Sequence, residues 1–135
     1  MIIVLDASTG IEIALDRGNA SLYTSYLMDA TKVITSDLYK AETSNVLWKY
    51  VKARFISKDR ALQTYQFCEA IIDEFIDLSE NAEESISEST RLNHSTYDLF
   101  YLTLARRHGA TLITLDGKLN ELAMENGIET AKTTR

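Results

Sequence analysis

Two short apolar runs decide the fold: Ile2-Ile3-Val4-Leu5 near the N-terminus and Thr111-Leu112-Ile113-Thr114-Leu115 near the C-terminus. Each run is followed directly by an aspartate, Asp6 in the first case and Asp116 in the second. Between them, other short apolar runs alternate with longer amphipathic segments. This alternation predicts an α/β fold in which helices cover a mainly parallel sheet.

The predicted strands are short, and helices fill the intervals between them. We predict strands at Ile2–Leu5, Val33–Thr35, Ile76–Leu78, Thr111–Leu115 and Ile128–Thr130. The first helix should begin at Ser8 or Thr9, where Thr9 and Glu12 form a capping box. Another should begin at Lys58 or Asp59, because Leu62, Tyr65, Cys68, Ile72 and Phe75 follow at helical spacing. The remaining helices are predicted over Asn19–Ala30, from Ser36 or Asp37 to Arg54, and over Glu80–Leu92, Ser95–His108 and Lys118–Asn126. The third and fourth helices should pair as a hairpin.

The bulk composition is that of one globular domain spanning residues 1–135. Hydrophobic residues make up 45% of the chain and charged residues 25%, without a low-complexity run. The first apolar run ends at Asp6 with no basic segment before it, and no run reaches membrane-spanning length. The single cysteine, Cys68, cannot form an internal disulfide. We therefore expect a cytoplasmic protein without a membrane anchor.

The net charge of −6 argues against a protein that binds nucleic acid over its whole surface. It does not exclude a nuclease, because divalent ions bound by clustered acids would present positive charge to a phosphate. The net charge alone therefore does not decide whether the protein acts on nucleic acid.

Four carboxylates occupy positions that can converge at one edge of the sheet. Asp6 and Asp116 follow predicted strands, and the carboxyl ends of parallel strands meet at the same edge. Glu42 and Asp98 lie near the starts of apolar helices, which begin at that edge, and Glu42 has no basic residue three or four positions away. Clustered carboxylates repel one another unless cations bind them, and oxygen ligands suit Mg²⁺ or Mn²⁺. The pattern predicts metal-assisted hydrolysis of a phosphate ester.

Taken singly, these acids have structural explanations. Asp98 could support a helix cap at Ser95, and Asp116 could simply cap the helix that follows it. Glu42 could be a plain surface residue. Their joint placement favours the functional interpretation.

Four segments, in order, resemble the motifs of the PIN-domain family, and in particular its VapC-type toxins. They are Ile3-Val4-Leu5-Asp6-Ala7-Ser8, Glu42-Thr43-Ser44-Asn45-Val46-Leu47, Tyr97-Asp98-Leu99-Phe100-Tyr101-Leu102-Thr103-Leu104-Ala105 and Leu112-Ile113-Thr114-Leu115-Asp116-Gly117-Lys118-Leu119. The resemblance implies a three-layer fold, with a sheet of about five strands between helices, and a ribonuclease that uses Mg²⁺ or Mn²⁺. It also implies that the metal-binding, catalytic carboxylates are Asp6, Glu42, Asp98 and Asp116, supported by Ser8, Asn45 and Thr114.

The same resemblance implies partners, namely RNA as substrate, an inhibitory antitoxin protein and a second copy of the chain in a homodimer. Of the basic residues near the motifs, Lys49 and Lys118 are the candidate RNA contacts. Lys49 falls on one helical stripe with Glu42 and Asn45, and Lys118 lies close to Asp116. Solvated helix faces are the alternative explanation for both lysines.

Two other functions fit part of the pattern. A haloacid-dehalogenase-like phosphatase also has an aspartate after its first strand, but Ser8 occupies the place of its second aspartate and Glu42 would have no role. A non-catalytic PIN-like scaffold that binds RNA or protein would be expected to have lost an acid, yet all four are present. The sequence does not specify the RNA target, the cleavage position, the metal used in the cell, the antitoxin or the oligomeric state, nor does it separate a toxin from a housekeeping nuclease.

Overall fold

The computed structural model describes residues 1–131, and four parallel strands form its central sheet. The strands are β1 (Ile2–Leu5), β2 (Lys32–Ser36), β3 (Glu74–Ile76) and β4 (Thr111–Ile113). Their order is β3-β2-β1-β4, so β1 lies inside the sheet, with Val4 opposite Ile34 on one side and Leu112 on the other. All three pairings are parallel. The carboxyl ends of the strands therefore share one edge, as predicted.

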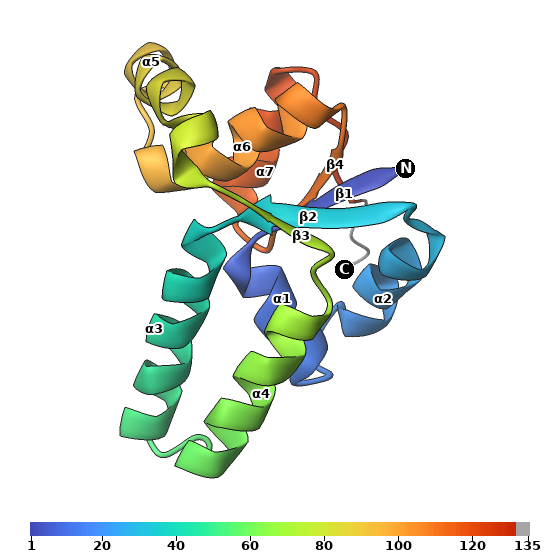
Figure 1. Ribbon diagram of the computed structural model, residues 1–135, viewed down its shortest axis with the longest axis vertical. Helices are drawn as coiled ribbons and strands as arrows, with labels where there is room; N and C mark the ends of the chain where they lie inside the picture. The colour runs from blue at the N-terminus through green and yellow to red at the C-terminus, as the bar shows by residue number, and fades with distance from the viewer. Residues whose placement is uncertain (132–135) are drawn as a thin grey trace.

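Helices cover both faces of this sheet. The helices are α1 (Ala7–Ala14), α2 (Ala20–Asp29), α3 (Leu38–Lys52), α4 (Lys58–Ala70), α5 (Ala82–Leu92), α6 (Thr96–His108) and α7 (Gly117–Glu125), with a short 3₁₀ turn, η1 (Leu78–Glu80). Figure 1 shows α1 to α4 on one face and α5 to α7 on the other. This arrangement confirms the three-layer α/β fold, and α3 and α4 pack together as the predicted hairpin.

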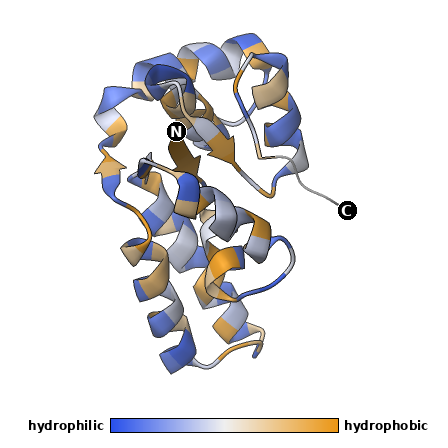
Figure 2. Ribbon diagram, turned by 90° about the vertical axis from the view of Figure 1, so that its right-hand side faces the viewer, coloured by the Kyte–Doolittle hydropathy of each residue, from blue (hydrophilic) through white to orange (hydrophobic). Residues whose placement is uncertain are grey.

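The core lies on both faces of the central strands. Ile3, Val4, Leu5, Leu112 and Ile113 are fully buried, because a strand covered on both faces needs apolar side chains in both directions. In Figure 2 the strands in the middle of the molecule accordingly carry the hydrophobic colour. Helix α6 contacts β1, β2 and β4, so it packs across three of the four strands.

Several predicted boundaries were wrong, each for a local reason. The third strand ends at Ile76, because Asp77 accepts the Ser79 N–H and starts η1, so Leu78 is not in a strand. Phe75 belongs to that strand, since α4 ends at Ala70. In the described residues, the expected fifth strand is reduced to a single bridge between Leu112 and Thr130.

The predicted capping box of the first helix was also wrong. Asp6, at the end of β1, caps α1 by accepting the Thr9 N–H. Glu12 does not reach back to the cap, because its carboxylate pairs with Arg17 beyond the end of the helix. The first acid of the proposed site is thus also the first residue of a tight connection between strand and helix.

The paired helices α3 and α4 expose large apolar side chains. Trp48 of α3 is 56% exposed and Phe55, in the turn between the two helices, is 75% exposed, whereas Tyr50 and Tyr65 are half-buried. A mainly apolar hollow of about 490 Å³ lies between the two helices, lined by Ser44, Leu47, Trp48, Val51, Lys58, Ala61, Leu62 and Tyr65. Core packing therefore does not account for Trp48 or Phe55.

Within residues 1–131, no helix has the length and apolar character needed to cross a bilayer.

Candidate active site

Asp6 is buried where β1 joins α1, and hydroxyl and backbone groups surround its carboxylate. Ser8 Oγ donates to Oδ1 at 2.7 Å, and the Thr9 N–H and hydroxyl donate to the same oxygen at 3.0 Å. Thr114, after β4, donates its hydroxyl to Oδ2. Burial raises the pKa of Asp6 more than these hydrogen bonds lower it. A cation at this position would relieve the cost of keeping the buried carboxylate charged.

Glu42 reaches the same region from the second turn of α3. Tyr101 of α6, fully buried, donates its hydroxyl to Glu42 Oε1 at 2.5 Å. Burial is the main reason that the pKa of Glu42 is raised, and repulsion from Asp6 and Asp98 raises it further, against the lowering effect of Tyr101. Three of the predicted acids are therefore electrostatically coupled at the edge of the sheet.

Asp98, in the first turn of α6, is held by a histidine rather than by the predicted cap. His94 Nε2 lies 2.7 Å from Asp98 Oδ2, and the His94 side chain is only 9% exposed. Ser95 caps the helix by accepting the Tyr97 N–H. The structural alternative for Asp98, support of the Ser95 cap, is thus not what the structure shows.

Asp116 caps α7, as its structural alternative proposed. Its Oδ1 accepts the N–H groups of Lys118 at 2.9 Å and Leu119 at 3.1 Å, and the residue is exposed. It remains linked to the buried acid, because its own N–H donates to the Thr114 hydroxyl, which in turn donates to Asp6. Asp116 therefore lies at the rim of the site rather than inside it.

The predicted supporting residues differ in their positions. Ser8 joins two loops, since its hydroxyl donates to Asp6 and accepts the Leu115 N–H at 3.2 Å. Thr114 is buried and bridges Asp6 and Asp116. Asn45 is exposed on α3, one turn beyond Glu42. The candidate RNA contacts Lys49 and Lys118 are exposed as well.

A hollow of about 340 Å³ opens beside these acids, between α1, α3 and the loop after β4. Its lining residues are Ala7, Ser8, Ile11, Arg17, Glu42, Val46, Tyr50 and Leu115. On α3 the lining residues recur every four positions, from Glu42 to Val46 to Tyr50, and this face excludes Lys49. The hollow is wide enough for part of a substrate beside Glu42.

The predicted convergence of four acids is only partial. Within residues 1–131, no three Asp, Glu, His or Cys side chains are arranged to hold one ion together. Glu42 and Asp98 turn toward Tyr101 and His94, and Asp116 turns toward its own helix. The donor chemistry still fits Mg²⁺ or Mn²⁺, because Mg²⁺ commonly takes only one or two carboxylates and keeps several water ligands. Asp6 and Glu42 offer such oxygens beside an open hollow.

Three residues at the site were missed in the sequence. From the sequence alone, helical spacing favours core packing for Tyr101, and His94 has no metal-ligand spacing. The sequence carried no clear signal for this pair, because His94 lies in the turn before α6 and not on the same helix as Asp98. Arg17 had no signal either, because it reaches the site only through the turn after α1.

The fold and site together define an α/β protein with an acidic site at the carboxyl edge of a parallel sheet. The chain belongs to the PIN domain family, whose sequence profile matches residues 3–125.

Individual relatives agree with this assignment. Ribonuclease VapC3 of Pyrobaculum aerophilum is 25% identical over 125 residues, which cover 90% of this chain and 94% of that protein. A VapBC2 structure from Rickettsia felis, bound to a DNA fragment from its promoter, has a TM-score of 0.71 at 16% identity and covers 99% of this chain and 100% of the matched chain. VapC20 of Mycobacterium tuberculosis, a toxin that cleaves the sarcin-ricin loop, has a TM-score of 0.67 at 15% identity, covering 89% and 94%. The structural likenesses show the fold.

Proposed function

We propose that this protein is a metal-dependent endoribonuclease and the toxin of a toxin–antitoxin pair. The observation that carries the proposal is the buried Asp6 carboxylate, which hydroxyls and a backbone N–H bind, and which repels Glu42 at the edge of an open hollow. Such an arrangement is costly without a cation. The similarity to Ribonuclease VapC3 supports the choice of RNA as substrate.

In this proposal Asp6 and Glu42 would hold Mg²⁺ or Mn²⁺, and Asp98 and Asp116 would complete the acidic site around it. The metal would lower the pKa of a bound water and stabilise the leaving oxygen of the phosphodiester. Ser8 and Thr114 fix the Asp6 oxygens, and Tyr101 and His94 fix Glu42 and Asp98. Asn45, Lys49 and Lys118 would contact RNA at the rim, where they are exposed.

The test compares RNA cleavage in Mg²⁺, Mn²⁺ and EDTA by the wild type and by an Asp6→Asn, Asp98→Asn double variant. The matched control is Asp29→Asn, because Asp29 is exposed on α2, away from the site. We expect metal-dependent cleavage by the wild type and the control only. Equal cleavage by the folded double variant would refute the site, and a folded wild type that cleaves no RNA in either metal would favour the non-catalytic scaffold. Membership of the PIN family leaves the phosphatase alternative without support.

Partners follow from the same comparisons. The likeness to a VapBC2 structure supports an antitoxin, which we propose is encoded by a neighbouring gene. The exposed Trp48 on α3 and Phe55 in the turn between α3 and α4 support self-association through that face. Co-expression with the neighbouring gene product should suppress RNA cleavage, and Trp48→Glu should lower the sedimentation coefficient from dimer to monomer. A housekeeping nuclease would cleave RNA equally with and without the neighbouring product.

A further inference from the structure

Arg17 occupies a turn that is built to hold it. Its two neighbours in the sequence, Asp16 and Gly18, have φ values of 50° and 56°, so the chain reverses sharply at this point. The Arg17 N–H donates to the Glu12 carbonyl at 3.2 Å, and its own carbonyl accepts the Ala20 N–H at 3.0 Å. Left-handed backbone on both sides, including a non-glycine residue, is uncommon. The backbone thus fixes the direction in which the Arg17 side chain leaves the turn.

Two side chains then orient the guanidinium. Arg17 Nε donates to Glu12 Oε1 at 2.9 Å, and Nη2 donates to the Tyr50 hydroxyl at 2.7 Å, with the guanidinium 5.3 Å from the centre of the Tyr50 ring. Glu12 is only 8% exposed, and Gly18 packs so closely that a Cβ there would lie 2.3 Å from Glu12 Oε2. These contacts leave Nη1 without a hydrogen-bond partner among residues 1–131.

The guanidinium is oriented at the wall of the candidate active site. Arg17 is the only Lys or Arg among the described residues that line the hollow containing Ser8 and Glu42. Its side chain is 47% exposed, so a ligand in the hollow can reach it. Tyr50 lies two helical turns beyond Glu42 on the same face of α3, which sets Arg17 apart from the metal-binding end of the hollow.

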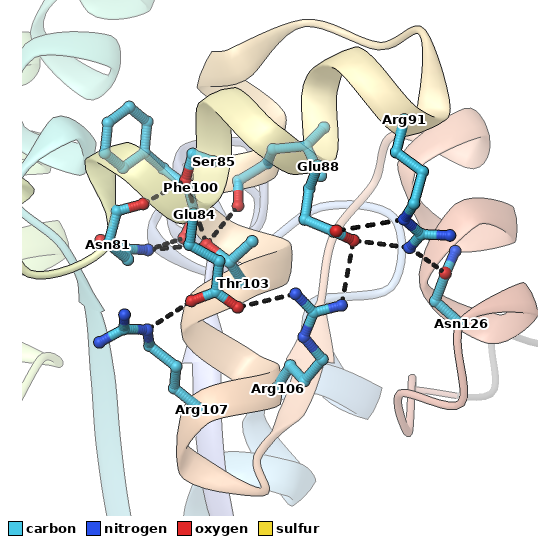
Figure 3. Close-up of polar contacts among 11 residues, drawn as sticks. Asn81, Glu84, Ser85, Glu88, Arg91, Phe100, Thr103, Arg106, Arg107 and Asn126 are labelled. Carbon is cyan, nitrogen blue, oxygen red and sulfur yellow. Dashed lines mark hydrogen bonds and ion pairs between the residues drawn. The ribbon is translucent and has the colours of Figure 1, made fainter.

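The arginines of α5 and α6 are already paired with carboxylates. Figure 3 shows Arg106 and Arg107 of α6 paired with Glu84 of α5, and Glu88 of α5 paired with Arg106 and with Arg91 of its own helix. These side chains do not line the hollow. Among the described residues, the basic side chain that can meet a phosphate inside the hollow is therefore Arg17.

We propose that Arg17, positioned by Glu12 and Tyr50, is a binding site for a backbone phosphate of single-stranded RNA next to the phosphate that is cleaved. This inference rests on the proposed ribonuclease function. A planar guanidinium with free N–H groups binds phosphate oxygens through paired hydrogen bonds, and its orientation before binding reduces the entropy lost on binding. The competing explanation is that the Glu12–Arg17 pair only stabilises the turn.

The experiment breaks the same ion pair in two ways that change the charge in opposite directions. Binding of a fluorescein-labelled pool of single-stranded RNA is measured in Ca²⁺ for the wild type, Arg17→Gln, Glu12→Gln and the control Arg60→Gln. Arg60 is exposed on α4 and outside the hollow, so its variant loses the same charge at another place. Thermal unfolding of each variant is measured in parallel, and wild-type cleavage in Mg²⁺ tests the ribonuclease function separately.

We expect Arg17→Gln to weaken RNA binding about tenfold and to reduce the slope of log K against log salt by about 0.7, as for one lost phosphate contact. Glu12→Gln should bind RNA at least as tightly as the wild type, because it removes a negative charge and keeps Arg17. Tyr50→Phe should weaken binding by a smaller factor without any change of charge, since it removes only the hydroxyl that holds Nη2.

Two results would overturn the inference. If Arg17→Gln and Glu12→Gln destabilise the fold alike but both bind RNA as Arg60→Gln does, the ion pair is only structural, and wild-type cleavage would leave the ribonuclease function standing. If the wild type neither binds nor cleaves RNA, the proposed function and this inference fail together.

Discussion

Two groups of carboxylic acids in this molecule have pKa values shifted in opposite directions. Burial raises the pKa of Asp6 and of Glu42 at the edge of the sheet. On α5, burial also raises the pKa of Glu84, but hydrogen bonds from Arg106 and Arg107 outweigh it, so the net shift is downward. The pKa of Glu88 is lowered to about 2, first by Arg91 and then by Arg106.

The difference lies in the partners rather than in the acids. The α5 carboxylates meet arginines, at 2.7 Å from Glu84 to Arg106 and 2.6 Å from Glu88 to Arg91 (Figure 3). Asp6 and Glu42 meet hydroxyls and a backbone N–H, which stabilise a carboxylate without neutralising it. Acids that a fold buries and leaves uncompensated are candidates for function, whereas compensated acids hold helices together.

The largest expected effect is on catalysis. Asp6→Asn should reduce metal-dependent RNA cleavage by at least about a thousandfold, equivalent to about 4 kcal/mol, because it removes a metal-binding oxygen that hydroxyls hold in place. Glu84→Gln, which changes an acid of the other group, should leave kcat/KM within about twofold. Single-turnover cleavage assays measure both. Similar losses in the two variants would mean that the α5 acids belong to the site.

The residues that hold the site acids should act through metal affinity. Tyr101→Phe removes the hydroxyl bound to Glu42, and His94→Ala removes the ring bound to Asp98. Each should weaken Mn²⁺ binding about 10- to 100-fold, the usual cost of losing a group that orients a metal ligand. Titration followed by electron paramagnetic resonance gives the affinity directly.

Tyr97→Phe is the matched control, because Tyr97 is 60% exposed on the same helix. If Tyr101→Phe lowers the melting temperature but binds Mn²⁺ as the control does, then Tyr101 is a core residue and no more.

The fold could be predicted from the sequence where one local pattern dominated. The run Ile2–Leu5 has no competing explanation, and Ser95 and Gly109 mark the ends of α6 through side-chain and left-handed backbone caps. Predicted element boundaries were wrong where a nearby polar side chain capped a different backbone N–H group. Asp77 ended β3 early, and Asp6 took over the cap assigned to Thr9.

The candidate site could be predicted only in part, because the order of residues along the chain places acids but not their orientation. The positions of Asp6, Glu42 and Asp98 at one edge follow from strand ends and helix starts. Their partners come from long-range packing: Thr114 is 108 residues from Asp6, and Tyr101 is 59 residues from Glu42. No periodic pattern encodes such contacts, so the divergent orientations of Glu42 and Asp98 required the structure.

A smaller effect is expected on the free energy of unfolding. Neutralising an acid at the edge of the sheet should stabilise the protein, whereas neutralising one on α5 should destabilise it. In EDTA at neutral pH, Glu42→Gln should stabilise the protein by about 1 kcal/mol or less after allowance for its partial exposure, because it ends the repulsion from Asp6 and Asp98. A raised folded-state pKa means that wild-type stability falls as the pH rises from the unfolded value through the folded value. The advantage of Glu42→Gln should therefore vanish below about pH 4.

Thermal unfolding at several pH values measures this advantage. Excess Mg²⁺ should remove it, since the bound ion compensates the wild-type carboxylates but binds the variant less well. Unfolding curves that coincide for the two proteins at neutral pH in EDTA would contradict the idea that Glu42 is uncompensated.

The smallest effect is expected from Glu88→Gln, which should destabilise the protein by under about 1 kcal/mol at neutral pH and leave RNA cleavage unchanged. Because the folded-state pKa of Glu88 is lowered to about 2, its stabilisation is present above the unfolded value of 4.5 and is lost as the pH falls through 2. The difference in unfolding free energy between Glu88→Gln and the wild type should therefore disappear on acidification. The difference for Glu42→Gln should also disappear, but there the variant is the more stable protein at neutral pH. Glu83→Gln, an exposed neighbour on α5, controls for the loss of one charge. A gap for Glu88→Gln that matches the control at every pH would show that the arginines around Glu88 contribute no net stability, and the two groups of acids would then differ only in burial.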